Sequence, residues 1–430
     1  MKPNSVRDTL EAALAAAGSD RARAVFTALM PASARVEADV ADARQRAGTS
    51  LGPLDGVVIS VKDLFDIKGA RTTAGSKIRQ TTSPATADAP AISRLRRAGA
   101  VLIGRTNMSE FAYSGLGLNP HYGTPGSALA PDRAPGGSTS GGAVSVALGL
   151  ARLTLGTDTG GSTRIPAAFN GIVGFKPTST RVPKTGCFPL SHALDSIGPL
   201  GRSVADCAAM DAILAGDEAT PLADVAIAGL RIGVPRGLLF ENTEPEVMHA
   251  VEAALVKLEK RGARIVDIDI DDLVLATRAA LGIGPIAACE AAQIHAEAIE
   301  SVPDDFDRRV LARILLGRDV PAWKYVEAVQ RREALKPAFS ARIGACDVLA
   351  LPTAPILPPL IAPLEADDAL FHATNLLTLR NTSLGNFMDC PALSLPLPVD
   401  GLPVGLMLMG ATGTDRRLFA IGQGIEAVLR

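Results

Sequence analysis

The stretch that decides the fold runs from Pro135 to Pro177 and reads PGGSTSGGAVSVALGLARLTLGTDTGGSTRIPAAFNGIVGFKP. Two loops of glycine and hydroxyl residues, 136–142 and 156–162, flank an apolar run over 143–155. The apolar run carries almost no charge, so we expect a buried helix followed by a strand. Glycine has no Cβ, so a substrate and backbone N–H groups can approach the serine hydroxyls closely. The pattern predicts polar loops that hold small-molecule chemistry on a buried scaffold.

Short apolar strands alternate with helical segments on both sides of this stretch. This β-α-β alternation predicts an α/β fold with a large central mixed β-sheet covered on both sides by α-helices. Strands are expected at 57–61, 100–104, 230–234, 263–269, 348–352, 392–396 and 404–409. Helices are expected over 5–48, 86–98, from Ser203 (a capping box with Asp206 in place of Glu), over 244–261 and over most of 271–345.

The remaining segments predict how the domain is organised. Residues 119–135 form a long loop rich in Pro and Gly, of a kind that is commonly functional, and the chain continues as loop from 177 to about 199. The chain shows no internal repeat and no low-complexity tract. We therefore expect a single domain over residues 1–430, with 210–375 as an insertion-like lobe.

Composition excludes several classes of function. With 430 residues, 47% hydrophobic content and 41 glycines, the chain is typical of a compact, loop-rich α/β enzyme. A net charge of −2 gives no electrostatic footprint for nucleic acid, and no Lys/Arg run marks a membrane surface. The first 20 residues are interrupted by Glu11 and predict an amphipathic helix, not a signal peptide. We therefore expect a cytoplasmic protein with no nucleic-acid or membrane partner.

Cysteine and histidine are scattered along the chain. The five cysteines are odd in number and never in CxxC spacing, which argues against a disulfide framework and a zinc knuckle. The five histidines include no HExxH pattern or other ligand spacing. The sequence therefore predicts no metal site and no metal catalysis.

The glycine loops do not match the common phosphate or hydrolase patterns. No lysine follows the glycines at 141–142 or 160–161, so a P-loop is absent, and the dinucleotide fingerprint is also missing. Position 164 is Arg, so Ser162 does not stand in a GxSxG elbow. What remains is serine chemistry without histidine, which needs another base. Lys62 is the candidate, because it ends an apolar strand where burial can lower its pKa from about 10.4 by roughly 3 units.

These segments together resemble the amidase signature hydrolases. The resemblance covers about residues 51–208 and 380–430. It rests on GVVISVKD, on the glycine–serine loop and above all on GTDTGGSTRIPAAFNGIVGFKP. Residues 210–375 match weakly and would be the variable helical lobe. It implies a nucleophile at Ser162, a bridging serine at Ser138 and a base at Lys62. It also implies an oxyanion hole formed by the backbone N–H groups of Thr159, Gly160, Gly161 and Ser162.

The serine loop departs from the family pattern in one respect. The common GGSSGG is here Gly136-Gly137-Ser138-Thr139-Ser140-Gly141-Gly142, so Ser140 competes for the role of bridging serine. The resemblance places the bridge 24 residues before the nucleophile, and the step from 138 to 162 matches this spacing, whereas the step from 140 does not. Ser138 is therefore the assigned bridge, and the resemblance implies a cis peptide bond before it.

Other polar residues near these segments leave alternatives open. Asp158 and Arg164 form either a buried pair that fixes the nucleophile turn or a grip for a substrate carboxylate. His192 and Asp195 are interpreted as structural, because the lysine system already supplies the base. The segment around Asn107–Phe111 and Tyr113 either lines an acyl pocket or packs in the core.

The resemblance implies an amidase that needs no cofactor and acts on a small carboxamide, releasing a carboxylic acid and ammonia or an amine. The alternative is the A subunit of a glutamyl/aspartyl-tRNA amidotransferase, which takes ammonia from glutamine inside a multi-subunit complex. A non-catalytic protein on the same scaffold is disfavoured, because all three catalytic positions are present. Substrate identity stays open, and so does assembly, for which a homodimer is one possibility.

Overall fold

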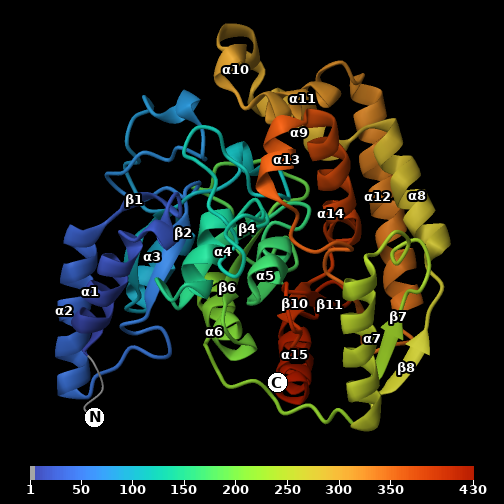
Figure 1. Ribbon diagram of the computed structural model, residues 1–430, viewed down its shortest axis with the longest axis horizontal. Coiled ribbons are helices and arrows are strands. Elements are labelled where there is room, and N and C mark those ends of the chain that lie inside the picture. The colour runs from blue at the N-terminus through green and yellow to red at the C-terminus, as the bar shows by residue number, and fades with distance from the viewer. Residues whose placement is uncertain (1–4) are drawn as a thin grey trace.

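The computed structural model describes residues 5–430 and is built on one mixed sheet of eleven strands (Figure 1). The strands are β1 (Phe26–Leu29), β2 (Val58–Lys62), β3 (Val101–Thr106), β4 (Leu153–Asp158), β5 (Val173–Lys176), β6 (Ser196–Gly201), β7 (Arg231–Val234), β8 (Arg264–Asp267), β9 (Val348–Pro352), β10 (Ala392–Pro396) and β11 (Gly405–Met409). Their spatial order is β1-β3-β2-β4-β6-β5-β10-β11-β9-β7-β8.

Parallel and antiparallel pairs are combined in this sheet. Strand β2 lies parallel to both β3 and β4, and β7 lies parallel to both β8 and β9. The central strands from β4 through β6, β5, β10 and β11 to β9 are antiparallel neighbours. The predicted mixed sheet is therefore confirmed.

Helices fill most of the connections. They are α1 (Val6–Ala17), α2 (Pro31–Ala47), α3 (Pro90–Arg97), α4 (Ser140–Ala147), α5 (Arg164–Asn170), α6 (Val204–Ala215), α7 (Pro245–Lys260), α8 (Asp271–Ile283), α9 (Ile286–Ile294), α10 (Ala296–Ser301), α11 (Arg308–Arg318), α12 (Ala322–Ile343), α13 (Ile361–Ala366), α14 (Asp368–Phe387) and α15 (Asp415–Leu429). Ser203 is the N-cap of α6, as predicted, because its hydroxyl accepts the Asp206 N–H at 3.1 Å. The Asp206 carboxylate pairs with Arg152, and no reciprocal bond of a capping box is formed among the described residues.

Helices cover both faces of the sheet centre. On one face, Leu200 of β6 packs with Ala143 of α4 and Ala167 of α5. Ile197 of the same strand belongs to the large core that includes Cys207 of α6. Side chains three positions apart on a strand point to opposite faces of the sheet, so Leu200 and Ile197 mark its two faces. Helices α4 and α5 therefore cover one face, and α6 and α15 cover the other, at the strands that carry the serine loops.

Three strands, β1, β5 and β6, were not expected where they occur. No strand was predicted at 173–176, where β5 is only four residues long. The helix predicted over 5–48 is wrong in its middle, where β1 forms the sheet edge antiparallel to β3. This strand is only four residues long, and a single residue, Met30, separates it from Pro31, which starts α2, so helical periodicity on both sides hides it. The loop predicted to reach about 199 is also wrong, because β6 begins at Ser196 and pairs along β4. Its glycines and Pro199 are residues that rarely mark a central strand.

The seven strands expected by residue range all form, with ends that agree within about two residues. The single-domain arrangement and the limits of its core and lobe stay a prediction.

Helices α8, α9, α11, α12 and α14 form the helical lobe beside one end of the sheet (Figure 1). One stretch of it, Asp271–Ile294, is long and apolar enough to cross a membrane by length and composition alone. It consists of two helices that are separated at Gly284 and Pro285, and it packs against α11 and α12. Of its most apolar window, 39% is buried in the structure.

Candidate active site

The amine of Lys62 lies at the base of the site. Lys62 ends β2, where every residue is buried, and its own side chain is 0% exposed. Its Nζ atom lies 2.8 Å from Ser138 Oγ and 2.8 Å from Thr157 Oγ1. Burial lowers the pKa of Lys62 to about 7, although the negative charges of Asp158 and Asp195 act in the opposite direction. A substantial fraction of this lysine is therefore neutral near pH 7.

Ser138 sits in a loop that requires glycine. The peptide bond between Gly137 and Ser138 is cis, as the family resemblance implies. A Cβ on Gly137 would stand 2.6 Å from the Gly117 nitrogen, so no other residue fits this close approach of two backbones. Ser140 instead starts α4, and its hydroxyl donates to the Asn107 carbonyl at 3.4 Å. The structure thus places Ser138, and not Ser140, against the lysine.

Ser162 lies in the turn between β4 and α5 and is 4% exposed. Its carbonyl accepts the N–H of Thr139 at 3.3 Å, which holds the turn against the residue that follows Ser138. Its hydroxyl makes no hydrogen bond to any other group in residues 5–430 and borders a pocket. The structure therefore brings the three predicted residues together, with Lys62 innermost and Ser162 at the pocket.

The four N–H groups predicted to form an oxyanion hole are not equivalent. The Gly161 N–H donates to Asp158 Oδ1 at 2.8 Å. Within the described chain, 5–430, the N–H groups of Thr159, Gly160 and Ser162 have no protein acceptor. The Thr159 hydroxyl donates to Asp195 at 2.5 Å and so anchors the start of the turn. The oxyanion hole stays a prediction, with Thr159, Gly160 and Ser162 as its unpaired donors among the described residues.

A buried ion pair fixes this turn from below. Arg164 is 0% exposed and donates to both carboxylate oxygens of Asp158, at 2.9 and 3.0 Å. The Thr163 N–H and hydroxyl donate to the same carboxylate. Burial alone would raise the pKa of Asp158, but the Arg164 guanidinium and these hydrogen bonds hold it well below its usual range. Of the two alternatives for this pair, the structural one is confirmed.

Helix α14 supplies partners that the sequence did not reveal. Asn386 accepts from Arg164 Nη2 at 2.6 Å and donates to Asp158 Oδ1 at 2.9 Å. The Thr382 hydroxyl donates to the Gly160 carbonyl at 2.6 Å. These residues lie more than 200 positions after the turn, so no local pattern could have connected them. Their segment, NTSLGNFMDC, is nevertheless unusually rich in small polar residues for a helix in the core.

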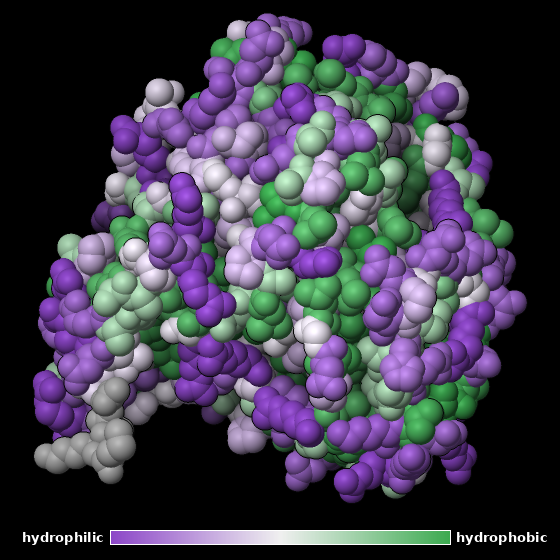
Figure 2. All heavy atoms as spheres, in the orientation of Figure 1, coloured by the Kyte–Doolittle hydropathy of each residue, from purple (hydrophilic) through white to green (hydrophobic). Residues whose placement is uncertain are grey.

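The pocket above Ser162 has a volume of about 330 Å³. Gly160, Ser162 and Tyr113 border it on the sheet side, and helices of the lobe border it on the other side. Its walls are mainly apolar, with side chains that include Leu190, Leu194, Leu281, Ile286, Leu379 and Phe387. At its edge Leu316 and Leu376 are exposed, and Figure 2 shows apolar (green) surface in the region of α13 and α14. Such a site suits a small substrate with an apolar body.

The remaining sequence candidates lie around this centre. His192 is exposed, whereas Asp195 is buried and accepts the N–H groups of Leu190 and Ser191, so the two do not form a catalytic pair. The Asn107 amide donates to two backbone carbonyls and is a packing group. Tyr113 is the member of its segment that reaches the pocket.

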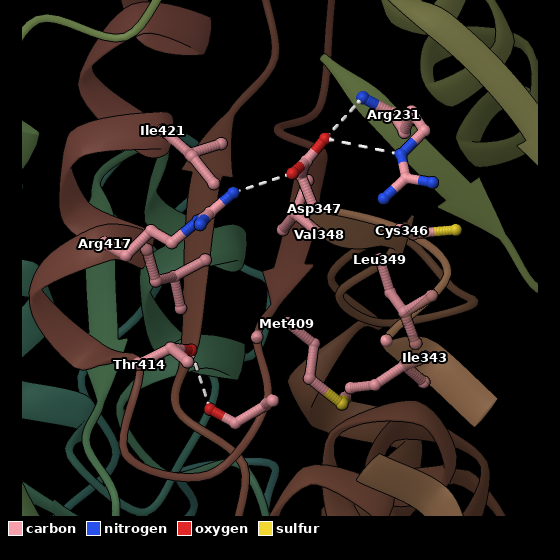
Figure 3. Close-up of a pocket in the computed structure, with 14 residues that line it drawn as sticks. Arg231, Ile343, Cys346, Asp347, Val348, Leu349, Met409, Thr414, Arg417 and Ile421 are labelled. Atoms are coloured by element: carbon pink, nitrogen blue, oxygen red, sulfur yellow. Dashed lines mark hydrogen bonds and ion pairs between the residues drawn. The ribbon is translucent and has the colours of Figure 1, made fainter. Parts of the chain in front are cut away.

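A second cavity, of about 290 Å³, lies between α15 and the ends of β7 and β9 (Figure 3). Asp347 is its central charge, and Arg417 donates to it at 2.7 Å while the Arg231 N–H donates at 2.9 Å. Its carboxylate is already neutralised, and no predicted site residue borders the cavity. The predicted catalytic residues therefore lie at the pocket of Ser162 and not at this cavity.

Comparison with known proteins agrees with this assignment. The family model described as Amidase matches residues 8–419. The 2-amino-5-chloromuconic acid deaminase of Comamonas testosteroni is 37% identical, over 93% of this chain and 87% of its own. The AtzE subunit of the 1-carboxybiuret hydrolase of Pseudomonas sp. (strain ADP) is 35% identical, over 98% and 95%. A crystal structure of an amidase, 35% identical, superimposes with a TM-score of 0.89 over 99% of this chain and 97% of that one.

These matches define a hydrolase of carbon–nitrogen bonds. The chain belongs to the amidase family and is an amidohydrolase. Its relatives also include the glutamyl-tRNA(Gln) amidotransferase of Symbiobacterium thermophilum, whose A subunit is 34% identical over 90% of this chain and 86% of its own.

Proposed function

We propose that this protein hydrolyses a small carboxamide through Lys62, Ser138 and Ser162, with an acyl-enzyme on Ser162. One observation carries the proposal: the buried amine of Lys62, whose pKa is lowered to about 7, lies 2.8 Å from Ser138, in the loop that contacts the pocket-bordering Ser162. A lysine with a lowered pKa can act as a general base near pH 7, where a solvated lysine cannot.

In this mechanism neutral Lys62 takes the proton of Ser138, and Ser138 takes the proton of Ser162. At the same time the Ser162 Oγ attacks the amide carbonyl. Backbone N–H groups of the turn stabilise the oxyanion, each typically worth about 3–4 kcal/mol. The proton returns through Ser138 to the leaving nitrogen, so that ammonia or an amine departs and not an amide anion. Water then attacks the acyl-enzyme by the same proton route and releases the carboxylic acid.

The decisive experiment measures ammonia release from small amides by wild type, Ser162→Ala, Lys62→Ala and, as a matched control, Ser140→Ala. We expect Ser162→Ala to lower kcat by at least about 10⁴-fold, as loss of a nucleophile does in other serine hydrolases. Ser140→Ala removes a neighbouring hydroxyl that points to Asn107, so it should retain activity. Hydroxylamine in the reaction should divert the acyl group to a hydroxamate in wild type and Ser140→Ala, but not in Ser162→Ala or Lys62→Ala.

Two outcomes would change the proposal. Full activity in Ser162→Ala would exclude the acyl-enzyme mechanism. Turnover of glutamine alone, and only with added partner proteins, would favour the amidotransferase alternative, for which the 34% identity to the amidotransferase of Symbiobacterium thermophilum is the supporting observation.

A further inference from the structure

Two arginines stand in the otherwise apolar wall of the Ser162 pocket. Arg313 comes from α11 and Arg380 from α14, and both are partly buried. No Asp or Glu borders the pocket. Positive charge in an apolar, acid-free pocket is costly unless something neutralises it, so these two side chains need an explanation.

Arg313 is not neutralised by the protein. It forms no ion pair with any residue of the described chain, 5–430, and its Nε is buried without a hydrogen-bond partner. Its guanidinium lies over the ring of Tyr113, with Cζ 4.5 Å from the ring centroid. The cation–π contact fixes the plane of the guanidinium beside the pocket and leaves N–H donors available for a ligand.

Arg380 is held in place but stays charged. It donates to the carbonyls of Leu239 and Glu241 and to the amide oxygen of Asn381, all of them neutral acceptors. Burial and the nearby Arg278 lower the pKa of Arg380 to about 10, so it remains a cation at neutral pH. The pocket thus carries two positive charges, of which Arg313 has the free donors.

We propose that Arg313 binds a carboxylate carried by the amide substrate, with Arg380 adding positive potential, so that the natural substrates are amic acids or related amide-bearing carboxylates. A planar guanidinium binds a carboxylate through two parallel hydrogen bonds, and such binding would satisfy the buried Nε. This inference rests on the proposed hydrolysis at Ser162, because it concerns the same pocket. Arg313 is a specificity residue that contacts the end of the substrate remote from the scissile bond.

The kinetic test compares each amic acid with the neutral diamide of the same length: malonamate with malonamide, succinamate with succinamide, and glutaramate with glutaramide. We expect wild type to prefer the acid, and Arg313→Gln to lower the acid-to-diamide ratio of kcat/KM by about 100-fold, the effect of losing a charged hydrogen bond. Arg313→Lys keeps the charge but not the planar fork, so it should restore part of the ratio. The matched control is Arg318→Gln on the same helix, because Arg318 is exposed, pairs with Asp319 and lies outside the pocket.

A binding experiment separates this inference from the catalytic mechanism. Calorimetry on Ser162→Ala should show tighter binding of the preferred amic acid than of its diamide, and Arg313→Gln in that background should remove the difference. Equal binding of acid and diamide, or an unchanged ratio in Arg313→Gln, would overturn the inference while leaving hydrolysis intact. A retained binding preference in a protein whose hydrolysis survives Ser162→Ala would support the inference and overturn the proposed mechanism.

Discussion

Arg164 and Arg313 show how differently two regions of one site treat the same side chain. In the turn that carries Ser162, Arg164 is completely buried and paired with Asp158, and its remaining donors go to Asn386, the Thr382 carbonyl and Met407 Sδ. In the pocket wall, Arg313 has no ion pair among the described residues, 5–430. The first arrangement fixes the geometry of the chemistry, and the second leaves a charge open to a ligand. Pairing inside the protein thus distinguishes a scaffold arginine from a binding arginine.

The largest expected effect is the loss of activity on substitution of Lys62, the proposed base beneath the turn that carries Ser162. Lys62→Met should lower kcat by up to about 10⁴-fold, the upper end of what a general base contributes. The melting temperature should not fall, because the variant no longer has to keep a buried amine neutral. Steady-state kinetics and calorimetry check both parts together. A large loss of stability would show that Lys62 supports the fold as Arg164 does.

Breaking the buried ion pair between Asp158 and Arg164 should lower both the stability and the activity of the protein. Asp158→Asn leaves Arg164 as an uncompensated buried charge, so we expect the free energy of unfolding to fall by about 3–5 kcal/mol. Asp206→Asn is the matched control, since it breaks the exposed pair with Arg152 and should cost about 1 kcal/mol or less. Denaturant titrations measure both variants, and equal losses would contradict the comparison.

The lowered pKa of Lys62, beneath the turn, should make both activity and stability depend on pH, a dependence that the pocket wall lacks. With a pKa of about 7 in the folded protein, kcat/KM should rise about tenfold per pH unit below pH 7 and level off above it. Between about pH 7 and the ordinary value of 10.5, the unfolded chain binds a proton that native Lys62 does not. The unfolding free energy should therefore rise with pH in this window, and Lys62→Met should remove that rise. A profile that is flat from pH 5 to 7 would exclude Lys62 as the base.

The smallest expected effect is the change in stability on substitution of Arg313, an arginine without an ion pair among the described residues. Arg313→Gln removes a charge that has no ion-pair partner among residues 5–430, so the free energy of unfolding should change by less than about 1 kcal/mol. Arg164→Gln is the contrasting variant, because it leaves the buried Asp158 carboxylate unpaired. Thermal unfolding of the two variants side by side measures the difference, and a large loss in Arg313→Gln would make that arginine structural.

The sequence was most informative where a local pattern carries the chemistry. The resemblance to the amidase signature hydrolases implied the roles of Lys62, Ser138 and Ser162, which their positions support, and alternating strands and helices predicted the mixed sheet. The sequence failed for β1, β5 and β6, because two four-residue strands and a strand rich in Gly and Pro lack the usual periodicity. Long-range partners were also missed, since the contacts of Asn386 and Thr382 depend on how α14 docks and not on neighbouring residues.

The position of β10 and β11 between β5 and β9 has a consequence for biosynthesis. Lys62, Ser138 and Ser162 leave the ribosome long before Asn386 and Thr382, at typical rates of about 5–20 residues per second. Until then β5 lacks its neighbour β10 and β9 lacks its neighbour β11. Arg164 also lacks its partners on α14. The growing chain thus carries its reactive groups in an incomplete sheet with two open edges, which are the kind of surface that chaperones protect. We therefore expect hydrolytic competence only after the hairpin of β10 and β11 has joined the two halves of the sheet.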